Sequence, residues 1–541
     1  MPAMVPGAEL AAVACRDVLA RVRHAAEGGG PPLEEVVNET VVHETRRLAH
    51  APHDERTAAD RAFVRHVAST LGRGREEAAP ALLDAIGERY GREIAGHFDE
   101  RVHRVVTSAL PLALTALLNG TSPGRALLRI HELPRLSDRL QVSGAVDRVV
   151  ALSRRGTLIV APTHVSNLDS VLLGYALFKL GLPPFAYGAG LNLFESQVMG
   201  FFMHHLGAYT VDRTKTDPLY KALLKEYATA SLERGQHGLF FPGGTRSRSG
   251  GLERSLKKGL LGTGLTALRR NVVARRPRPL VYVVPCTLTY PLVLEAASLV
   301  EGFLERSGEA MWIRPADDEY DRVGRWIRFL EGILALDLDV HLRLGEPLDP
   351  FGCPVDDEGR SLDPHGRPID SVGYLRDEDE HVVDDPARDA EYTRSLEVAL
   401  LAAYRRENVV LASSLVAFVV FEQLRRAAGA SSLHRFLRRL GPWTRVRLSE
   451  VARDVGRALD EVHTLAAGGR VGLVDDLGRD PELVIDRALG TFATYHDPHV
   501  LVADGVDLLV GDPNLLFYYR NRLDETGLLG APSTLDGWDV G

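Results

Sequence analysis

The strongest constraint on the fold is an alternation of short apolar runs with longer amphipathic segments between residues 140 and 347. Short β-branched runs predict strands, and apolar residues at helical spacing predict the helices between them. This alternation predicts an α/β fold, with a mostly parallel sheet and flanking helices. The predicted strands cover residues 158–161, 185–188, 208–211, 238–241, 281–288 and 340–344, and the predicted helices cover residues 168–182, 195–206, 217–234 and 256–270.

The regions on both sides of this unit have a different pattern. Residues 1–134 show helical apolar spacing interrupted by breakers such as GGGPP, which predicts a helical accessory domain. Residues 349–388 are dense in Asp, Gly and Pro, which predicts a surface hairpin or linker, and residues 389–541 are again mainly helical. Because 541 residues are too many for one core, we expect two helical domains around a central domain at residues 135–348.

Composition argues against several classes of protein. The chain is 45% hydrophobic and 25% charged, as globular proteins are, and its net charge of −9 argues against nucleic acid as a partner. The 3 cysteines lie far apart without a C-x-x-C pair, so neither a disulfide framework nor a structural zinc site is expected.

The sequence also bears on location. The first residues lack a basic region followed by an apolar core, which predicts a protein without a signal peptide, in the cytoplasm. The apolar runs at residues 105–118 and 409–421 are shorter than the ~18 residues that a membrane span needs. Each is expected to be a buried helix or to lie in the membrane interface.

The first candidate site is a histidine and a carboxylate in the segment THVSNLD. An apolar run ends at Pro162, and the residues after the histidine enter a helix, so His164 follows a strand and Asp169 lies in the first helical turn. The carboxylate can accept from one imidazole nitrogen and leave the other to remove a proton from a hydroxyl. No G-x-S-x-G surrounds the pair, so that hydroxyl would belong to a substrate. Among 19 histidines, such a pair also arises by chance.

A second block combines GAGLNLF at residues 188–194 with a return strand that ends at Arg213. The planar guanidinium of an arginine at this place suits a phosphate monoester, which it can hold in bidentate fashion. The alternative is a surface arginine paired with Asp212 or Asp217.

A third block, FFPGGTRSRSG at residues 240–250, places two arginines among hydroxyls on a glycine-containing loop. The loop follows a predicted strand, where open α/β sheets bind ligands, and it predicts a phosphate site. A solvated loop is the alternative. LKKGLL adds cations after it, and VVPCTLTYPLVLE at residues 283–295 predicts a strand or the wall of an acyl-chain site. The candidate substrate-binding residues of these blocks are Arg213, Gly244, Thr245, Arg246, Ser247, Arg248, Lys257 and Tyr290.

In order and spacing, the four blocks resemble those of the glycerol-3-phosphate acyltransferase family, within the glycerolipid acyltransferases whose first block is H-x-x-x-x-D. The similarity covers residues 135–347 and extends more loosely to residues 414–425 and 515–523. The resemblance implies an acyltransferase domain at residues 135–348 and acyl transfer from a thioester, either acyl-CoA or acyl carrier protein. The acceptor would be a hydroxyl of glycerol-3-phosphate, and the product lysophosphatidate, an intermediate of phospholipid biosynthesis.

The resemblance also implies roles for residues of this sequence. His164 would be the general base and Asp169 its orienting partner, with Arg213, Arg246 and Arg248 as phosphate ligands. It implies neither a metal nor another cofactor. Because the product partitions into lipid, it implies peripheral contact with the inner face of the cell membrane.

Two positions depart from the family pattern. Gly243 stands where the third block usually has Glu, and Val165 stands where the glycerol-3-phosphate branch usually has Arg. Lysophosphatidate and dihydroxyacetone phosphate therefore remain alternative acceptors. A lipid- or phosphate-binding scaffold without activity is an alternative of another class. A nucleotide-binding protein is disfavoured, because neither G-x-G-x-x-G nor G-x-x-x-x-G-K-[ST] occurs.

Overall fold

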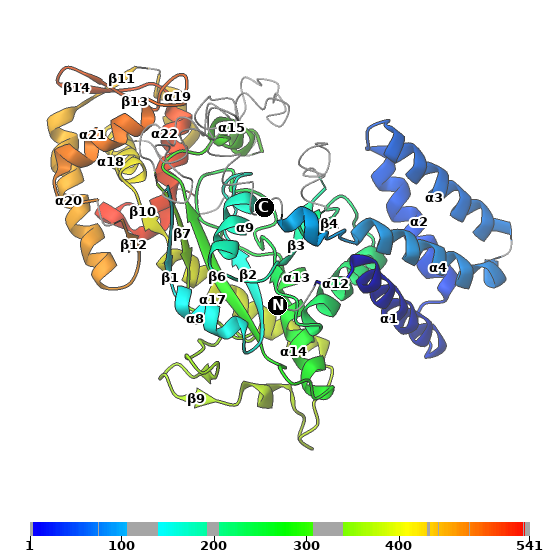
Figure 1. Cartoon of the computed structure of the whole chain (residues 1–541). Helices are drawn as coiled ribbons and strands as arrows, with labels where there is room; N and C mark the ends of the chain where they lie inside the picture. Colours follow the sequence, from blue (N-terminus) through cyan, green and yellow to red (C-terminus); the bar gives the residue numbers. More distant parts are fainter. Residues whose placement is uncertain are drawn as a thin grey trace.

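Figure 1 shows the computed structural model of the chain, with helices at both ends of the sequence and a sheet between them. The structure describes residues 4–73, 75–104, 139–191, 205–306, 339–429, 433–441, 443–474, 477–533 and 535.

The central element is a seven-stranded sheet with the order β1-β7-β6-β2-β5-β3-β4. Neighbouring strands are parallel except β6 and β7, which run antiparallel. The prediction of an α/β fold with a mostly parallel sheet is confirmed. The strands are β1 Leu140–Gly144, β2 Thr157–Pro162, β3 Ala186–Gly190, β4 Ala208–Val211, β5 Gly238–Leu239, β6 Val281–Thr289 and β7 Val340–Leu344.

Strand β2 is buried on both faces of the sheet. Leu158 and Val160 belong to one apolar cluster and Ile159 and Ala161 to another, and all four side chains are fully buried. This explains the uninterrupted apolar run, because a strand covered on both faces does not alternate between apolar and polar residues. Each large aliphatic side chain buried in this way stabilises the fold by roughly 1.5–3 kcal/mol.

Helices cover both faces of the sheet. The cluster that contains Leu158 continues into α8 Val146–Ser153, α9 Asp169–Lys179 and α15 Ala296–Arg306. The cluster that contains Ile159 continues into α14 and α17. The remaining helices of this part are α12 Pro218–Glu233, α13 Lys258–Leu261, α14 Thr263–Val273 and α17 Pro386–Arg406.

The differences from the predicted elements have local causes. Strand β1 was not predicted, because most of its residues are not buried and it lacks an apolar run. The predicted strand at residues 238–241 has strand pairing only at its first two residues, before Pro242. The predicted helix at residues 256–270 is interrupted at Gly262, and the predicted helix at residues 195–206 lies mostly outside the described residues.

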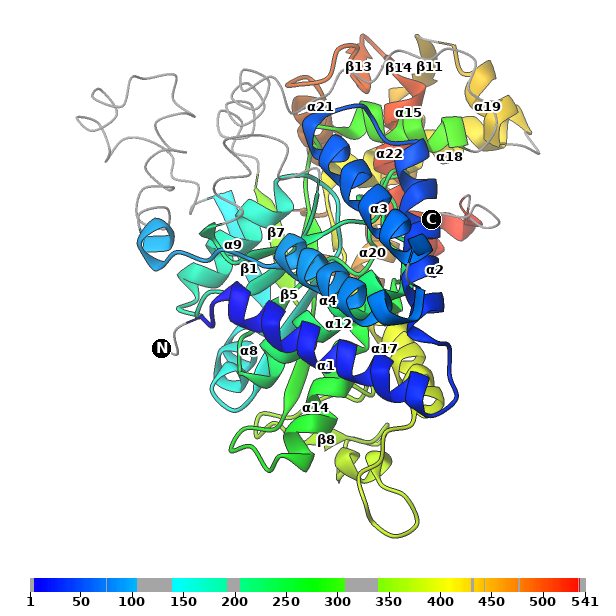
Figure 2. The same ribbon diagram turned by 90° about the vertical axis from the view of Figure 1, so that its right-hand side faces the viewer.

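The N-terminal helices pack together and against α12. They are α1 Gly7–Glu27, α2 Leu33–Ala49, α3 Glu55–Arg73 and α4 Arg75–Ile94. Val18, Leu83 and Leu223 are buried in the apolar cluster that these helices share with α12. Figure 2 shows α1 and α4 crossing the side of the molecule on which α12 lies. The expectation of helices in this region agrees with α1–α4, although α4 ends at Ile94 and residues 105–134 are not described.

The segment between the sheet and the C-terminal helices contains a short hairpin. It is formed by β8 Ser361–Leu362 and β9 Pro368–Ile369, followed by the 3-10 helix η2 Ser371–Leu375.

The C-terminal part combines helices with two small sheets and shares the core of the central sheet. Its helix α18 is buried along most of its length, and Val416 and Phe421 join the cluster that contains Leu158. The helices and 3-10 helices are α18 Ala412–Ala428, α19 Leu433–Arg439, α20 Leu448–Ala467, α21 Pro481–Phe492, α22 Pro513–Arg520, η3 Asn521–Thr526 and η4 Leu528–Gly530. The strands are β10 Val409–Val410, β11 Thr444–Arg447, β12 Gly472–Leu473, β13 Leu501–Asp504 and β14 Asp507–Val510.

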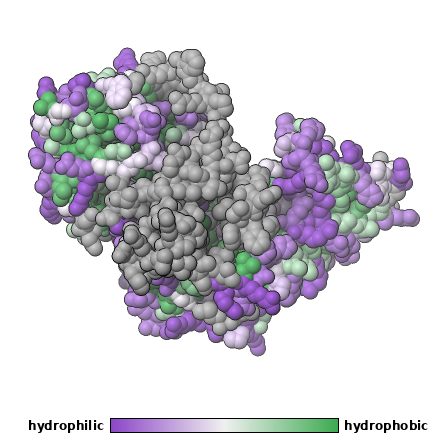
Figure 3. All heavy atoms as spheres, turned by 45° about the horizontal axis from the view of Figure 1, so that its top comes forward, coloured by the Kyte–Doolittle hydropathy of each residue, from purple (hydrophilic) through white to green (hydrophobic). Residues whose placement is uncertain are grey.

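On the face seen in Figure 3, hydrophilic and hydrophobic residues are interspersed over the N-terminal and the C-terminal parts. Within the part of the chain that the structure describes, no helix has both the length and the apolar character that crossing a membrane requires. The apolar run at residues 409–421 forms the short strand β10 and most of the buried helix α18, as expected for a buried segment. The run at residues 105–118 is not described.

Candidate functional site

A cavity of about 410 Å³ lies at the carboxyl ends of strands β2, β3, β4 and β5, where a parallel sheet is expected to bind ligands. Such a volume is typical of small-molecule sites. The cavity is lined by His164, Asn167, Ser170, Tyr187, Gly188, Ala189, Gly190, Arg213, Phe241, Thr245, Arg246, Arg248, Ser298, Leu299 and Gly302.

The predicted histidine–carboxylate pair is formed at this cavity. His164 is the second residue after β2, and Asp169 is the first residue of α9. The distance between His164 Nδ1 and Asp169 Oδ2 is 2.8 Å, and Asp169 is fully buried. A carboxylate in the first turn of a helix is also favoured by the helix dipole.

Four hydrogen bonds define the protonation of the pair. Besides the imidazole, Asp169 Oδ2 accepts from the main-chain N–H groups of Val165, at 2.7 Å, and Ser166, at 3.0 Å. Asp169 Oδ1 accepts from the hydroxyl of Tyr290 at 2.6 Å. Burial and the nearby Asp169 carboxylate raise the pKa of Tyr290 well above its usual value, so this hydroxyl keeps its proton. Since the carboxylate acts as the acceptor in each bond, His164 Nδ1 carries a hydrogen and Nε2 is left as the basic nitrogen.

The His164 ring is also fixed by its neighbours. It stacks on Phe241, with 4.2 Å between the ring centroids and 26° between the ring planes. Its main-chain carbonyl accepts from Ser247 N at 2.7 Å, so the third block contacts the first directly. The histidine is thereby held in one orientation, with 15% of its side chain exposed at the cavity.

Glu295, at the end of the fourth block, connects three parts of the site. Its Oε2 accepts from the hydroxyl of Ser166 at 2.9 Å, and its Oε1 accepts from the main-chain N–H of Asn167 at 3.0 Å. The same Oε1 accepts from Arg246 Nη1 at 3.0 Å. This almost completely buried carboxylate therefore fixes both the loop that follows His164 and one arginine of the third block.

Three of the predicted phosphate ligands meet at the cavity. Arg213 comes from the end of β4, and Arg246 and Arg248 come from the loop after β5. Partial burial and the charge of Arg246 lower the pKa of Arg213. Partial burial and the charges of Arg306 and Arg246 lower the pKa of Arg248. Cations that repel one another in this way favour a bound anion.

Arg213 is exposed, but the two carboxylates suggested as its alternative partners have other partners. Asp212 pairs with Arg56 at 3.1 Å, and Asp217 caps α12 and accepts from the hydroxyl of Tyr90 at 2.8 Å. Within the described part of the chain, no ion pair of Arg213 is found, nor one of Arg248.

The other candidate residues have different positions. Thr245 lines the cavity, whereas Ser247 donates its hydroxyl to Gly251 O at 2.6 Å. Gly244 has a left-handed φ of +82°, which explains why a glycine stands there. Lys257 is an exposed residue before α13 and does not line the cavity, and Tyr290 lies behind Asp169. Gly244, Ser247, Lys257 and Tyr290 do not line the cavity, so its geometry does not support the expected substrate contact for these four residues.

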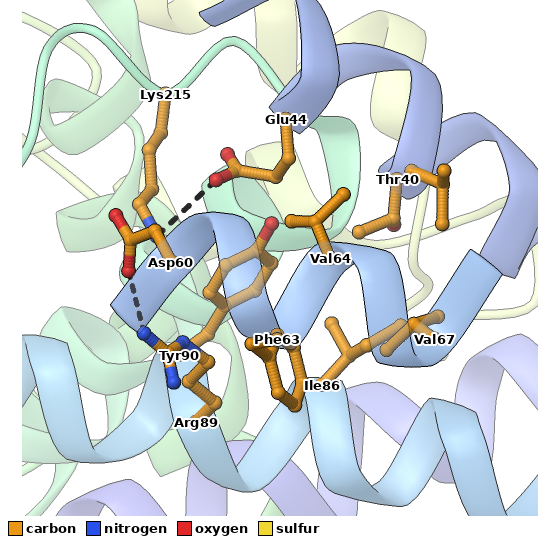
Figure 4. Close-up of a pocket in the computed structure, with 11 residues that line it drawn as sticks. Thr40, Glu44, Asp60, Phe63, Val64, Val67, Ile86, Arg89, Tyr90 and Lys215 are labelled. Atoms are coloured by element: carbon orange, nitrogen blue, oxygen red, sulfur yellow. Dashed lines mark hydrogen bonds and ion pairs between the residues drawn. The ribbon is translucent and has the colours of Figure 1, made fainter. Parts of the chain in front are cut away.

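The loop after Arg213 is attached to the N-terminal helices. Lys215 is almost completely buried, and its Nζ lies 2.6 Å from Glu93 Oε2 and 3.9 Å from Glu44 Oε2. It also lies over the ring of Tyr90. Figure 4 shows Lys215 reaching between Glu44 and Asp60, with Tyr90 beneath it. Because Arg213 lies only two residues before Lys215, this network also holds the segment that contains Arg213.

Sequence reasoning did not identify Glu295 or Glu253 as functional residues. Glu295 was visible as the last residue of the fourth block, but nothing in the sequence connects it to Arg246. Glu253 accepts from the main-chain N–H of His164 at 2.7 Å, across 89 positions of sequence. The described residues contain no group of three or more His, Cys, Asp and Glu side chains placed to hold a metal ion.

Comparison with known proteins identifies the same region. Residues 144–289 match the model of a family described as acyltransferase. A glycerol-3-phosphate acyltransferase of Ectopseudomonas mendocina is 31% identical over 222 residues, which are 41% of this chain and 24% of that protein. The enzyme of the same name from Pseudomonas putida strain GB-1 is 30% identical over 249 residues, 46% of this chain and 26% of that protein.

These matches confirm the resemblance to the glycerol-3-phosphate acyltransferase family drawn from the four blocks. The family model includes His164, Asp169 and the arginines of the second and third blocks. The matched part of the chain spans about a quarter of the length of the curated relatives.

Proposed function

We propose that this protein is a glycerol-3-phosphate O-acyltransferase, which transfers a fatty acyl group from a thioester to a hydroxyl of glycerol-3-phosphate. The observation that carries the proposal is the placement of the His164–Asp169 pair and three arginines at one cavity. A base and an anion site in the same cavity are what acylation of a phosphorylated alcohol requires. The resemblance to the acyltransferase family supports the same reaction.

His164 acts as the general base in this proposal. Its Nε2 accepts the proton of the acceptor hydroxyl as the hydroxyl oxygen attacks the thioester carbonyl carbon. The tetrahedral intermediate then expels the thiol sulfur, which takes the proton from the imidazolium, so an ester and a free thiol leave the site. Asp169 keeps the tautomer and stabilises the imidazolium, and Tyr290 stabilises the Asp169 carboxylate.

Arg213, Arg246 and Arg248 bind the acceptor phosphate in this proposal. A small acceptor has no acyl chain to hold it, so its affinity comes mainly from converging cations. Arg246 is held by Glu295 in the structure. The charge of Arg246 repels both Arg213 and Arg248, so these two arginines gain most from an added anion. Holding the phosphate here places a glycerol hydroxyl in the same cavity as the His164 side chain.

The test is thiol release by the purified protein from acyl-CoA and from acyl-loaded carrier protein, with and without glycerol-3-phosphate. We expect release that depends on glycerol-3-phosphate and falls by about 10²–10⁴-fold in His164→Ala. Thermal unfolding of the variant serves as the control for folding. Acceptor-dependent release within a few-fold of the parent in a folded His164→Ala protein would contradict the assignment of the base.

Lysophosphatidate is the alternative acceptor, favoured by one observation. Val165 stands where the related branch usually has Arg, and its side chain lies in the apolar cluster, so this position adds no charge to the cavity. An acceptor panel decides between the two. We expect glycerol-3-phosphate to be preferred, with a higher acceptor KM in Arg246→Ala; a preference for lysophosphatidate with both donors would select the alternative.

A scaffold that binds lipid or phosphate without turnover predicts no thiol release with either donor. For the acyltransferase, we propose peripheral contact with the inner face of the cell membrane, because the lysophosphatidate product partitions into lipid. Flotation with phospholipid vesicles, followed by release in high salt or alkali, tests this contact. Failure to float with vesicles, or resistance to both treatments, would contradict it.

A further inference from the structure

Glu253 brings a carboxylate to the main chain of the proposed base. Its Oε1 accepts from the main-chain N–H of His164 at 2.7 Å. The main-chain carbonyl of His164 accepts from Ser247 N at 2.7 Å. Both polar groups of the His164 main chain are therefore held by the segment that follows β5, whereas Asp169 holds the ring. The histidine depends on this segment for its position relative to the cavity.

The Glu253 side chain fills the space beside Gly243. A Cβ atom at Gly243 would lie 2.9 Å from Glu253 Cγ and 3.3 Å from Glu253 Oε1. The two positions therefore compete for one volume. By the resemblance drawn from the four blocks, Glu is usual at the position of Gly243. In this chain Glu253, ten residues later in SGGLERS, occupies the space that a side chain at position 243 would need.

The segment that delivers Glu253 is itself fixed at several points. Ser249 O accepts from Asn521 Nδ2 at 2.8 Å, and Arg254 pairs with Asp524 at 2.8 Å. Ser247 closes the turn by donating its hydroxyl to Gly251 O. These contacts tie the segment to the C-terminal part of the chain, so the glutamate reaches His164 from a rigid support rather than from a free loop.

We propose that Glu253 is a positioning residue that fixes the main chain of His164, and that it replaces a carboxylate lost from position 243. The inference rests on the proposed function, since it assigns a role to Glu253 in acyl transfer by His164. It depends on two geometric facts: the hydrogen bond to His164 N and the shared space with Gly243. The carboxylate does not itself line the cavity, so it acts through the histidine.

The charged groups around Glu253 act in opposite directions. Burial raises its pKa to about 7, the hydrogen bond from His164 N lowers it, Arg522 lowers it, and Asp169 raises it. Tyr404 also faces it. The carboxylate form is the stronger acceptor for the His164 N–H, because hydrogen bonds to charged groups are about twice as strong as neutral ones. Glu253→Gln therefore keeps an acceptor and weakens the bond.

The test moves the carboxylate from position 253 to position 243. We expect Glu253→Ala to lower kcat at least tenfold and to leave the KM for glycerol-3-phosphate within twofold, because the arginines are untouched. Gly243→Glu alone should also lower activity, since its side chain collides with Glu253. The double variant Gly243→Glu/Glu253→Ala should be more active than either single variant. Gly243 has no left-handed φ, so glutamate is compatible with its main chain.

The outcomes separate this inference from the proposed function. Parent protein and His164→Ala are measured in the same assay, and an inactive parent contradicts the proposed function. With an active parent, Glu253→Ala activity within twofold of the parent contradicts the positioning role. A double variant no more active than Glu253→Ala contradicts the replacement. If Glu253→Ala does not fold, Glu253→Gln takes its place, with an expected few-fold loss of kcat and an unchanged KM; a shift in KM instead would contradict the role.

Discussion

The N-terminal and C-terminal regions contact the central sheet to different extents through apolar packing. The C-terminal helices share one continuous apolar cluster with the sheet, which includes Leu158 of β2 and Phe421 of α18. The N-terminal helices belong to a second apolar cluster, which includes α12 and Tyr209 of the edge strand β4. They also reach the loop after β4 through charged groups. Apolar packing depends little on pH, whereas ion pairs depend on pH and are screened by salt.

This difference divides the proposed site into two halves. The C-terminal region supports the His164–Asp169 pair and the third-block loop. Asn521 donates a hydrogen bond to Ser249 O, and Arg522 donates one to Leu288 O. Arg213 rests on the N-terminal region, through Lys215 two residues later. Perturbing the C-terminal region should therefore affect kcat and global stability, and perturbing the N-terminal region should affect binding of the acceptor.

The largest expected effect is on the C-terminal side, at Arg520. This side chain is fully buried, pairs with Asp524 and with Glu422 at 2.6 Å, and lies over the rings of Phe418 and Phe421. Arg520→Ala breaks two fully buried ion pairs and leaves a cavity, although Asp524 keeps Arg254 and Glu422 keeps Arg425 as partners. The loss of buried pairing and packing costs about 3 kcal/mol. We expect a large loss in the free energy of unfolding, measured by urea denaturation, together with the loss of thiol release.

The matched control is Arg445→Ala, which removes an arginine that is 60% exposed from the same region. It should change the free energy of unfolding by less than about 0.5 kcal/mol. If Arg520→Ala were as mild as the control, the C-terminal region would not share the stability of the sheet, and the comparison between the two regions would fail.

The next effect is on the N-terminal side, at Lys215. Lys215→Met removes the cation between Glu93 and Glu44 but keeps an apolar stem beside Tyr90. Glu44 keeps Arg47 and the partly exposed Glu93 keeps Arg89, so losing this cation costs about 1 kcal/mol locally. We expect the KM for glycerol-3-phosphate to rise about tenfold, because Arg213 loses its support, while kcat changes less than threefold.

The control for Lys215→Met is Lys221→Met, an exposed lysine of the adjacent helix α12. Its steady-state constants should equal those of the parent. A Lys215→Met protein whose kcat falls while its KM is unchanged would show that the N-terminal helices support the dyad, contrary to the division proposed.

The sequence predicted the half of the site that local patterns define. The buried run before Pro162 and the entry to α9 located His164 and Asp169, because strand burial and helix starts are readable from neighbouring residues. Arg213 and Arg246 were also located, since each follows a strand at the same edge of a parallel sheet.

The other half depends on contacts between distant positions, and these left no local signal. The antiparallel pairing of β6 with β7 joins Cys286 to Leu344, and β1 has too few buried residues to be recognised. The departure at Gly243 was visible in the sequence, but its filling by Glu253 appears only when the chain is folded. Similarly, nothing local indicates that Lys215 is buried between N-terminal carboxylates.

A smaller effect concerns acid, and it should be local to the N-terminal helices. Burial raises the pKa of Asp60, but hydrogen bonds from Arg47 and Arg89 lower it by more. The net pKa of Asp60 therefore lies below the usual 3.8. A lowered folded-state pKa contributes stability that is present above the usual value and is lost as the pH falls through the folded-state value. We expect the protection of main-chain amides in α2–α4 against hydrogen exchange to fall below pH ~4, before the protection of amides in β2 and β6 falls.

The control for the acid experiment is Asp60→Asn, which removes the titrating group. The protection of its amides in α2–α4 should be lower than in the parent at pH 7 and should change less with acid. A simultaneous loss of protection in the helices and in the central strands of the parent would contradict the separation of the two regions.

The smallest effect is expected for Asn521→Ala, which removes one hydrogen bond between the C-terminal region and the third-block loop. Asn521 Nδ2 donates to Ser249 O at 2.8 Å, and both residues are buried. Removing the donor leaves a buried carbonyl without this partner, which costs about 1 kcal/mol. Because Ser249 lies between Arg248 and the segment that ends at Glu253, the strain is shared between acceptor binding and the position of His164. We expect kcat/KM to fall about fivefold, with changes in both constants and little change in urea midpoint.

The control is Asn521→Asp, which keeps the size of the side chain but removes the donor, and its kcat/KM should be as low as that of Asn521→Ala or lower. Parent-like kinetics in both variants would mean that packing alone, without this hydrogen bond, supports the loop.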